Sequence, residues 1–176
     1  THANMLVQCV YMHAVEWGLA QEDSFLVTTP LAHRSGCSRM FNALGLGGTL
    51  VVMQKFDPAA AIELIERERI TVAGLVPTVI RMLLPHVRQD PRRCASLRRL
   101  IVAAEAFPVA LKQEIMALLP EAQIYSLFGL TEAQARAKGL AVRCRGAVGL
   151  WERCDHAGVA ADAAGGARPA SVPADC

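Results

Sequence analysis

The segment Leu127-Phe-Gly-Leu-Thr-Glu132 contains three residues whose types and spacing suit the binding of a phosphate together with a metal ion. Gly129 lets the backbone approach a ligand more closely than a residue with a Cβ atom could. Thr131 offers a hydroxyl to a phosphate oxygen, and Glu132 offers the kind of carboxylate oxygen that Mg²⁺ prefers. The same residues would also suit an ordinary helix start, with Thr131 as the N-cap and Glu132 favouring the helix dipole. Taken alone, the motif leaves both interpretations open.

The segments before this motif alternate between short apolar runs and amphipathic stretches, with proline and glycine between them. Continuous apolar runs are typical of strands buried on both faces, and the amphipathic stretches between them are typical of crossover helices. The pattern predicts an α/β fold with a mostly parallel sheet and helices on both faces. Buried strands are expected over residues 24–29, 49–53, 71–76, 98–104 and 122–127, and helices over residues 4–19 and 34–48 and after Pro58, Pro77 and Pro108.

Loops at the carboxyl ends of parallel strands are where such sheets bind ligands. Four loops meet this condition, and their sequences are TTPLAH, VPT, AAEAF and LFGLTE, which lie within residues 28–33, 76–78, 103–107 and 127–132. Because these ends share one edge of a parallel sheet, the four loops are expected to lie along a common rim.

The motif YSLFGLTEA, residues 125–133, resembles the Tyr-x-x-Tyr-Gly-x-Thr-Glu signature of the adenylate-forming superfamily. That superfamily includes acyl-CoA synthetases, peptide-synthetase adenylation domains and luciferases. Upstream, LRRLIVAAEAFP is similar to its "LRxxxxGGEALP" segment, and ITVAGLVPTVIRMLL, TTPLAHRSG and THANM are similar to three further segments, in the expected order. The resemblance implies a partial N-terminal domain of an adenylate-forming enzyme.

The resemblance also implies a reaction, in which a carboxylic acid attacks the α-phosphate of ATP and the acyl group passes to a thiol. The cofactors implied are ATP, Mg²⁺ and coenzyme A, and the partners are a carboxylic acid and CoA or a pantetheine thiol. By the same resemblance, Thr131 would bind the α-phosphate, Glu132 would hold Mg²⁺, and His33 would lie at the acyl pocket. The adenine site would be lined by Ala104, Glu105 and Ala106, and its wall by Ser126, Leu127, Phe128 and Gly129.

Several positions depart from the superfamily pattern. Ala103 and Ala104 replace its two glycines, which narrows the adenine site. Phe128 replaces a tyrosine and keeps only the stacking face. Ala32 replaces an aromatic residue of the superfamily, next to His33. For His33 itself, the alternative to a place at the acyl pocket is a partly buried loop histidine with no role in binding. None of these changes alone is disabling.

Residues 133–176 differ in composition from residues 1–132, being rich in Ala and Gly and lacking Ile, Phe, Tyr and Met. Residues 1–132 are therefore interpreted as the central part of an AMP-binding domain, and residues 133–176 as an irregular or disordered tail. A GC-rich gene read in the wrong frame would give this composition; a natural Ala/Gly-rich linker is the alternative.

The resemblance places a phosphate-binding loop before Thr1 and the catalytic Lys after Glu132, and neither is found in the chain. The function expected is that of a fragment of an ATP-dependent acid–CoA ligase that is inactive alone. A non-catalytic binding module and an adenylation-domain remnant of a peptide synthetase are the alternatives. Fatty, aromatic and amino acids all remain open as substrates.

Composition excludes several other classes. With 53% hydrophobic and 19% charged residues and a net charge of +2, the chain has no excess charge for a nucleic-acid or membrane-surface partner. No apolar run approaches the roughly 20 residues that span a bilayer. The sequence has no basic-then-apolar leader of the secretory type, and the six cysteines form no CxxC pair or tight framework. Reduced thiols in a cytoplasmic protein are therefore expected. A zinc site is not expected, because the spacing of Cys144, Cys154 and His156 fits no zinc pattern. The arginines of residues 88–99 are expected to lie in a loop and to be solvated.

Overall fold

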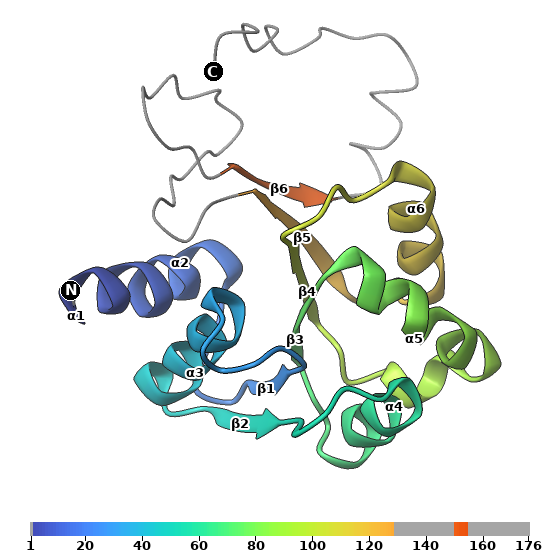
Figure 1. Ribbon diagram of the computed structural model, residues 1–176, viewed down its shortest axis with the longest axis horizontal. Helices are drawn as coiled ribbons and strands as arrows, with labels where there is room; N and C mark the ends of the chain where they lie inside the picture. Colours follow the sequence, from blue (N-terminus) through green and yellow to red (C-terminus); the bar gives the residue numbers. More distant parts are fainter. Residues whose placement is uncertain (1, 129–149, 155–176) are drawn as a thin grey trace, which may run out of the picture.

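A twisted sheet runs through the computed structural model, which describes residues 2–128 and 150–154 (Figure 1). Within those residues the sheet has the strand order β2-β1-β3-β4-β5-β6. The first five strands are parallel, and β6 is antiparallel to β5. The strands are β1 (Ser24–Val27), β2 (Thr49–Val52), β3 (Val72–Leu75), β4 (Arg99–Ala103), β5 (Gln123–Phe128) and β6 (Leu150–Cys154).

Helices cover both faces of this sheet, as the alternating pattern predicted. In Figure 1, α1 to α3 lie on one side of the strands and α4 to α6 lie on the other. The helices are α1 (His2–Met5), the π-helical segment η1 (Leu6–Met12), α2 (His13–Trp17), α3 (Arg34–Leu46), α4 (Pro58–Arg67), α5 (Pro77–Gln89), the 3₁₀ segment η2 (Pro91–Cys94) and α6 (Val109–Leu118).

Strand residues alternate between two hydrophobic cores. On β1, Phe25 belongs to the core under α2 and α3, whereas its neighbour Leu26 belongs to the core under α4 to α6. On β5, Tyr125 and Ile124 divide between the two cores in the same way. Because successive side chains of a strand point to opposite faces, an apolar run is the pattern that a sheet covered on both faces requires.

Local signals in the sequence account for where the helices begin and end. The Asp57 carboxylate accepts a hydrogen bond of 2.9 Å from the backbone N–H of Ala60, and Pro58 opens α4. Helix α3 ends at Gly47, whose φ of +76° is the left-handed conformation that favours glycine. The predicted starts after Pro58, Pro77 and Pro108 are confirmed.

Two expectations need correction. Residues 49–53 do not form a buried strand, because β2 lies at an edge of the sheet with β1 as its only described neighbour, and Val52 is 45% exposed. Residues 150–154 are not irregular, because β6 pairs with β5, with Phe128 opposite Leu150. An edge position cannot be recognised from an apolar run, since the run does not state how many neighbours the strand will have.

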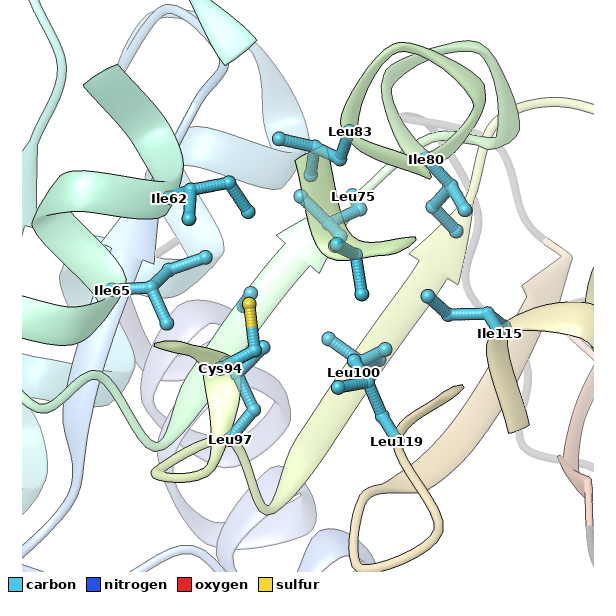
Figure 2. Close-up of a pocket in the computed structure, with 12 residues that line it drawn as sticks. Ile62, Ile65, Leu75, Ile80, Leu83, Cys94, Leu97, Leu100, Ile115 and Leu119 are labelled. Carbon is cyan, nitrogen blue, oxygen red and sulfur yellow. The ribbon is translucent and has the colours of Figure 1, made fainter. Parts of the chain in front are cut away.

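The core under α4 to α6 encloses a cavity of about 20 Å³. Figure 2 shows the side chains around it, which come from the helices as well as from β3 and β4. Its lining is apolar and its volume is close to that of one water molecule, so it stays dry and cannot hold a nucleotide or an acyl chain. A functional site must therefore lie elsewhere.

Among the described residues no helix is long and apolar enough to cross a membrane. In the same part of the chain Cys9, Cys37 and Cys94 are free thiols. Burial raises the pKa of the Cys94 thiol to about 11, so this cysteine is an unreactive core residue.

Candidate functional site

The strand order places a topological switch point between β1 and β3. From β1 the chain moves outward to β2, then crosses back past β1 to β3 and continues through β4 to β5. Helix α3, which follows β1, lies on one face, and helix α5, which follows β3, lies on the other. In open α/β sheets ligands bind in the crevice that forms where the connections diverge in this way.

The registers align the carboxyl ends of the strands along one edge. Val27 of β1 is opposite Gly74 of β3, and Val102 of β4 is opposite Ser126 of β5. The loops after β1, β3, β4 and β5 therefore lie along a common rim, as expected from the sequence. At about 4.8 Å between neighbouring strands, the loop after β1 lies roughly 10 Å from the loop after β4.

His33 lies on this rim as the N-cap of α3, with its imidazole exposed. Its Nδ1 accepts a hydrogen bond of 3.3 Å from the backbone N–H of Ser35, and it lies 2.9 Å from the Ser35 hydroxyl. That hydroxyl lies 3.0 Å from the hydroxyl of Thr29. A Cβ atom on Gly36 would collide with the carbonyl oxygen of Pro30, so glycine permits the close packing of this loop. The contact of His33 with an acyl group stays a prediction.

Ala104, Glu105 and Ala106 form an exposed loop between β4 and α6. The Glu105 carboxylate does not project away from the protein. Its Oε2 accepts hydrogen bonds from the backbone N–H of Thr78 at 3.1 Å and from the Thr78 hydroxyl at 2.8 Å. Thr78 lies in the first turn of α5, whose own N-cap residue, Val76, makes no side-chain cap. The structure thus links the second and third loops of the rim.

Ala104 has a φ of +72°, in the left-handed region that residues with a Cβ atom rarely adopt. The adenylate-forming superfamily has glycine at this position of the motif, as the sequence comparison indicated. The departure at Ala104 therefore strains the backbone of the loop in addition to narrowing the space above it.

Ala104→Gly is expected to increase the free energy of unfolding by about 0.5–1 kcal/mol. It removes a left-handed conformation costing about 1–2 kcal/mol, and the greater freedom of glycine in the unfolded chain offsets about half of that gain. Urea unfolding measures the difference. Ala106→Gly is the matched control, since Ala106 is exposed and is not among the described residues with positive φ; it should lower stability by a similar amount. An Ala104→Gly protein that is less stable than wild type would refute this account of the strain.

Ser126 and Leu127 lie on β5 and are half-buried between β4 and β6. Leu127 is opposite Ala103 on one side and Trp151 on the other. The backbone of Phe128 ends β5. Gly129, Thr131 and Glu132 lie outside the described residues, and their roles in binding phosphate and Mg²⁺ stay predictions.

The sequence reasoning missed a buried polar cluster formed by His13, Trp17, Arg39 and Asn42 between the first helices and the sheet. Arg39 is 5% exposed, and within the described part of the chain its Nε and Nη1 have no hydrogen-bond partner. Its guanidinium lies 5.0 Å from the centre of the Trp17 ring, which stacks at 3.9 Å on His13. Burial lowers the pKa of Arg39 to about 9. Burial, followed by the charge of Arg39, holds the pKa of His13 well below its usual value.

Thr78 was also missed, although its VPT loop was picked out at the carboxyl end of a strand. The sequence shows that the loop of Thr78 precedes the loop of residues 104–106 at the same edge of the sheet. It does not show that the side chain of Glu105 turns towards Thr78.

The arginines of residues 88–99 do not lie in a single loop. Arg88 lies at the end of α5, Arg92 and Arg93 lie in η2, and Arg99 begins β4, so that only Arg98 lies in a connection. Arg93 contacts Glu66 at 2.6 Å, and Arg99 contacts the buried Asp23 at 3.2 Å. Two further pairs are Arg88 with Glu114 and Arg92 with Asp90. The pairs formed by Arg88, Arg92 and Arg93 are largely exposed and contribute little stability. The pair of Arg99 with Asp23 is mostly buried.

The fold and rim define an α/β protein whose candidate ligand site is the set of loops at the carboxyl edge of a parallel sheet. Residues 1–167 match the family of AMP-binding enzymes, and the chain belongs to that family. The match continues past Glu132 into the segment where composition indicated a frame error; the reading frame itself stays a prediction.

Curated relatives of the chain are CoA ligases. It is 37% identical over 101 residues to a 2-succinylbenzoate–CoA ligase of Bacillus pumilus, covering 57% of this chain and 20% of that protein. It is 33% identical over 132 residues to the medium/long-chain-fatty-acid–CoA ligase FadD8 of Mycobacterium tuberculosis, covering 74% of this chain and 23% of that protein. The chain thus spans between a fifth and a quarter of the length of these two relatives.

Solved structures with the same fold are adenylate-forming enzymes. The o-succinylbenzoate CoA synthetase of Bacillus subtilis, in complex with ATP and magnesium ion, has a TM-score of 0.66 and 26% identity over 75% of this chain and 26% of that one. The nonribosomal peptide synthetase FmoA3 has a TM-score of 0.68 and 25% identity over 73% of this chain and 14% of that one. The predicted fold class and superfamily are confirmed.

Proposed function

We propose that the chain is part of an AMP-forming acid–CoA ligase and contributes the adenine and acyl side of its adenylate site. The observation that carries the proposal is the arrangement of the rim, where the loops bearing His33 and Glu105 lie beside the end of β5 that bears Ser126, at one edge of the sheet in a member of the AMP-binding family. The relatives named for CoA ligation support coenzyme A as the acceptor.

Each loop would have a distinct task in this reaction. The exposed backbone of residues 104–106 would lie against adenine, and the strand end formed by Ser126, Leu127 and Phe128 would separate adenine from the acyl group. His33 would lie beside the acid at the switch point. Thr131 would donate to the α-phosphate, and Glu132 would hold Mg²⁺, which neutralises phosphate charge.

One feature of the described rim suits a nucleotide, namely the exposed loop of residues 104–106. Exposed backbone at the carboxyl edge of a parallel sheet is where this class of fold binds nucleotides. By itself the chain is proposed to bind the nucleotide without useful turnover, because the resemblance assigns the stabilisers of the β- and γ-phosphates to segments that its sequence does not show.

The proposal predicts that the purified chain binds AMP, ATP·Mg²⁺ or a non-hydrolysable acyl-adenylate mimic in isothermal titration calorimetry. Glu132→Ala should weaken ATP·Mg²⁺ by about tenfold or more and AMP without metal much less, because the carboxylate acts through Mg²⁺. Thr131→Val should weaken all three, because it removes a hydroxyl donor to the shared α-phosphate.

Glu121→Ala is the matched control for these measurements, since Glu121 is an exposed carboxylate just before β5, at the opposite end of that strand. It should leave all affinities unchanged. Absence of binding to all three ligands by a folded wild-type chain would favour the non-catalytic binding module instead.

A further inference from the structure

The carboxylate of Glu105, in the loop after β4, accepts hydrogen bonds from Thr78 at the start of α5. This contact changes the role that is expected of Glu105. The sequence indicated that Glu105 lines the adenine site. In the structure its Oε2 is occupied by two donors of Thr78, 27 residues earlier in the chain. We propose that Glu105 is a positioning residue, whose carboxylate fixes the loop of residues 104–106 so that backbone alone faces the nucleotide. This proposal rests on the function proposed above.

The contact supplies what the start of α5 lacks. The first backbone N–H groups of a helix have no partner within the helix, and a negative charge near them is favourable. Val76, at the N-cap position, has no side-chain oxygen to offer, and Pro77 has no N–H. The Glu105 carboxylate accepts the Thr78 N–H from outside the helix and takes the Thr78 hydroxyl with the same oxygen.

The backbone preceding Glu105 is shaped to allow this contact. Ala104 adopts a left-handed φ of +72° directly after β4 ends at Ala103. A strained conformation of this kind persists only where its surroundings hold it in place. The hydrogen bonds between Glu105 and Thr78 are the side-chain contact that holds this loop next to Ala104.

The tie also joins neighbouring parts of the rim. Strands β3 and β4 are paired, with Leu75 opposite Val102, so that their following loops start side by side. The loop after β3 borders the switch point, and the loop after β4 borders the end of β5. Glu105 therefore sets the position of the proposed adenine loop relative to the crevice.

The test compares six variants with wild type in AMP affinity by calorimetry. Glu105→Ala should weaken AMP binding by about tenfold, because it removes both hydrogen bonds, and Thr78→Val by about three- to tenfold, because valine removes the hydroxyl donor and keeps the backbone N–H. The double variant should be no weaker than Glu105→Ala, because that substitution already removes the whole tie. Glu105→Gln and Thr78→Ser, which keep an acceptor and a hydroxyl, should stay within about threefold of wild type. Glu121→Ala is the distant control and should have no effect.

A Glu105→Ala loss that Thr78→Val does not share would show direct contact with the nucleotide and overturn the proposal. So would strictly additive losses in the double variant. Hydrogen exchange of the Thr78 amide and of residues 104–106, without ligand, provides an independent reading of the tie.

Exchange should accelerate in Glu105→Ala and Thr78→Val and not in Glu105→Gln; unchanged exchange in all variants would overturn the proposal. If wild type fails to bind AMP while its exchange pattern follows this expectation, the proposed function fails and the tie stands as a structural feature only.

Discussion

Arg39→Met is expected to raise the free energy of unfolding by about 2–4 kcal/mol. The guanidinium is buried with Nε and Nη1 unpartnered within the described residues, and burial lowers its pKa from the usual arginine value to about 9. At about 1.4 kcal/mol per pKa unit, the fold disfavours the charged form by roughly 5 kcal/mol. Loss of the interaction with Trp17, about 1–2 kcal/mol, offsets part of the gain. Methionine takes the place of the apolar stem of Arg39 and has no charged group that needs a hydrogen-bond partner.

The gain should depend on pH in a defined direction. Below pH 9 both the folded and the unfolded protein carry the proton on Arg39, so the full cost of the buried charge is present. Above pH 9 the unfolded chain keeps the proton that the folded protein has released, and stability rises with pH. The advantage of the methionine variant should therefore be constant up to about pH 9 and shrink above it.

Urea unfolding of both proteins at pH 8 and pH 10.5 measures this change, and the difference between the proteins removes the contributions of other titrating groups. Arg81→Met is the control, because Arg81 lies on α5 and is exposed; it should change stability by less than about 0.5 kcal/mol. A destabilised Arg39→Met protein would show that the cation has a partner that offsets its burial.

Leu100→Ala is expected to lower the free energy of unfolding by about 4 kcal/mol. Leu100 is 1% exposed and already lines the cavity of Figure 2. Truncation joins the lost side-chain volume to an existing void whose walls come from four helices and two strands. Such a site cannot collapse easily, so the cost should lie towards the upper end of the range of 2–5 kcal/mol for this substitution.

Leu44→Ala makes the same chemical change on the outer side of α3, where Leu44 is 70% exposed. Its effect should stay below about 0.5 kcal/mol. Equal losses for the two variants in urea unfolding would mean that the core under α4 to α6 is loosely packed.

Much of the fold was predictable because its signals are local. Asp57 followed by Pro58 marks a helix start wherever it occurs, and Gly47 supplies the left-handed residue that ends α3. Apolar runs such as residues 100–103 indicate a strand covered on both faces, because only that environment makes consecutive apolar residues favourable. These features determine the elements without reference to the rest of the chain.

Other features depend on relations between distant segments and could not be predicted. The exposure of Val52 follows from the place of β2 in the strand order, which its own residues do not encode. Glu105 was assigned to the site from its motif, yet its partner Thr78 is set by how two loops meet. The burial of Arg39 could not be predicted, because a helix position that faces the sheet normally carries an apolar side chain.

The switch point between β1 and β3 has a consequence for folding kinetics. β1–β2, β3–β4 and β4–β5 join strands that follow one another in the chain, but pairing Phe25 with Val72 closes a loop that includes β2 and two helices. Non-local parallel pairings form slowly, because the entropy of loop closure is lost before contacts compensate for it. We expect the β1–β3 pairing to limit the folding rate. The crevice proposed to bind the acid would then be absent from partly folded intermediates and appear only in the last step.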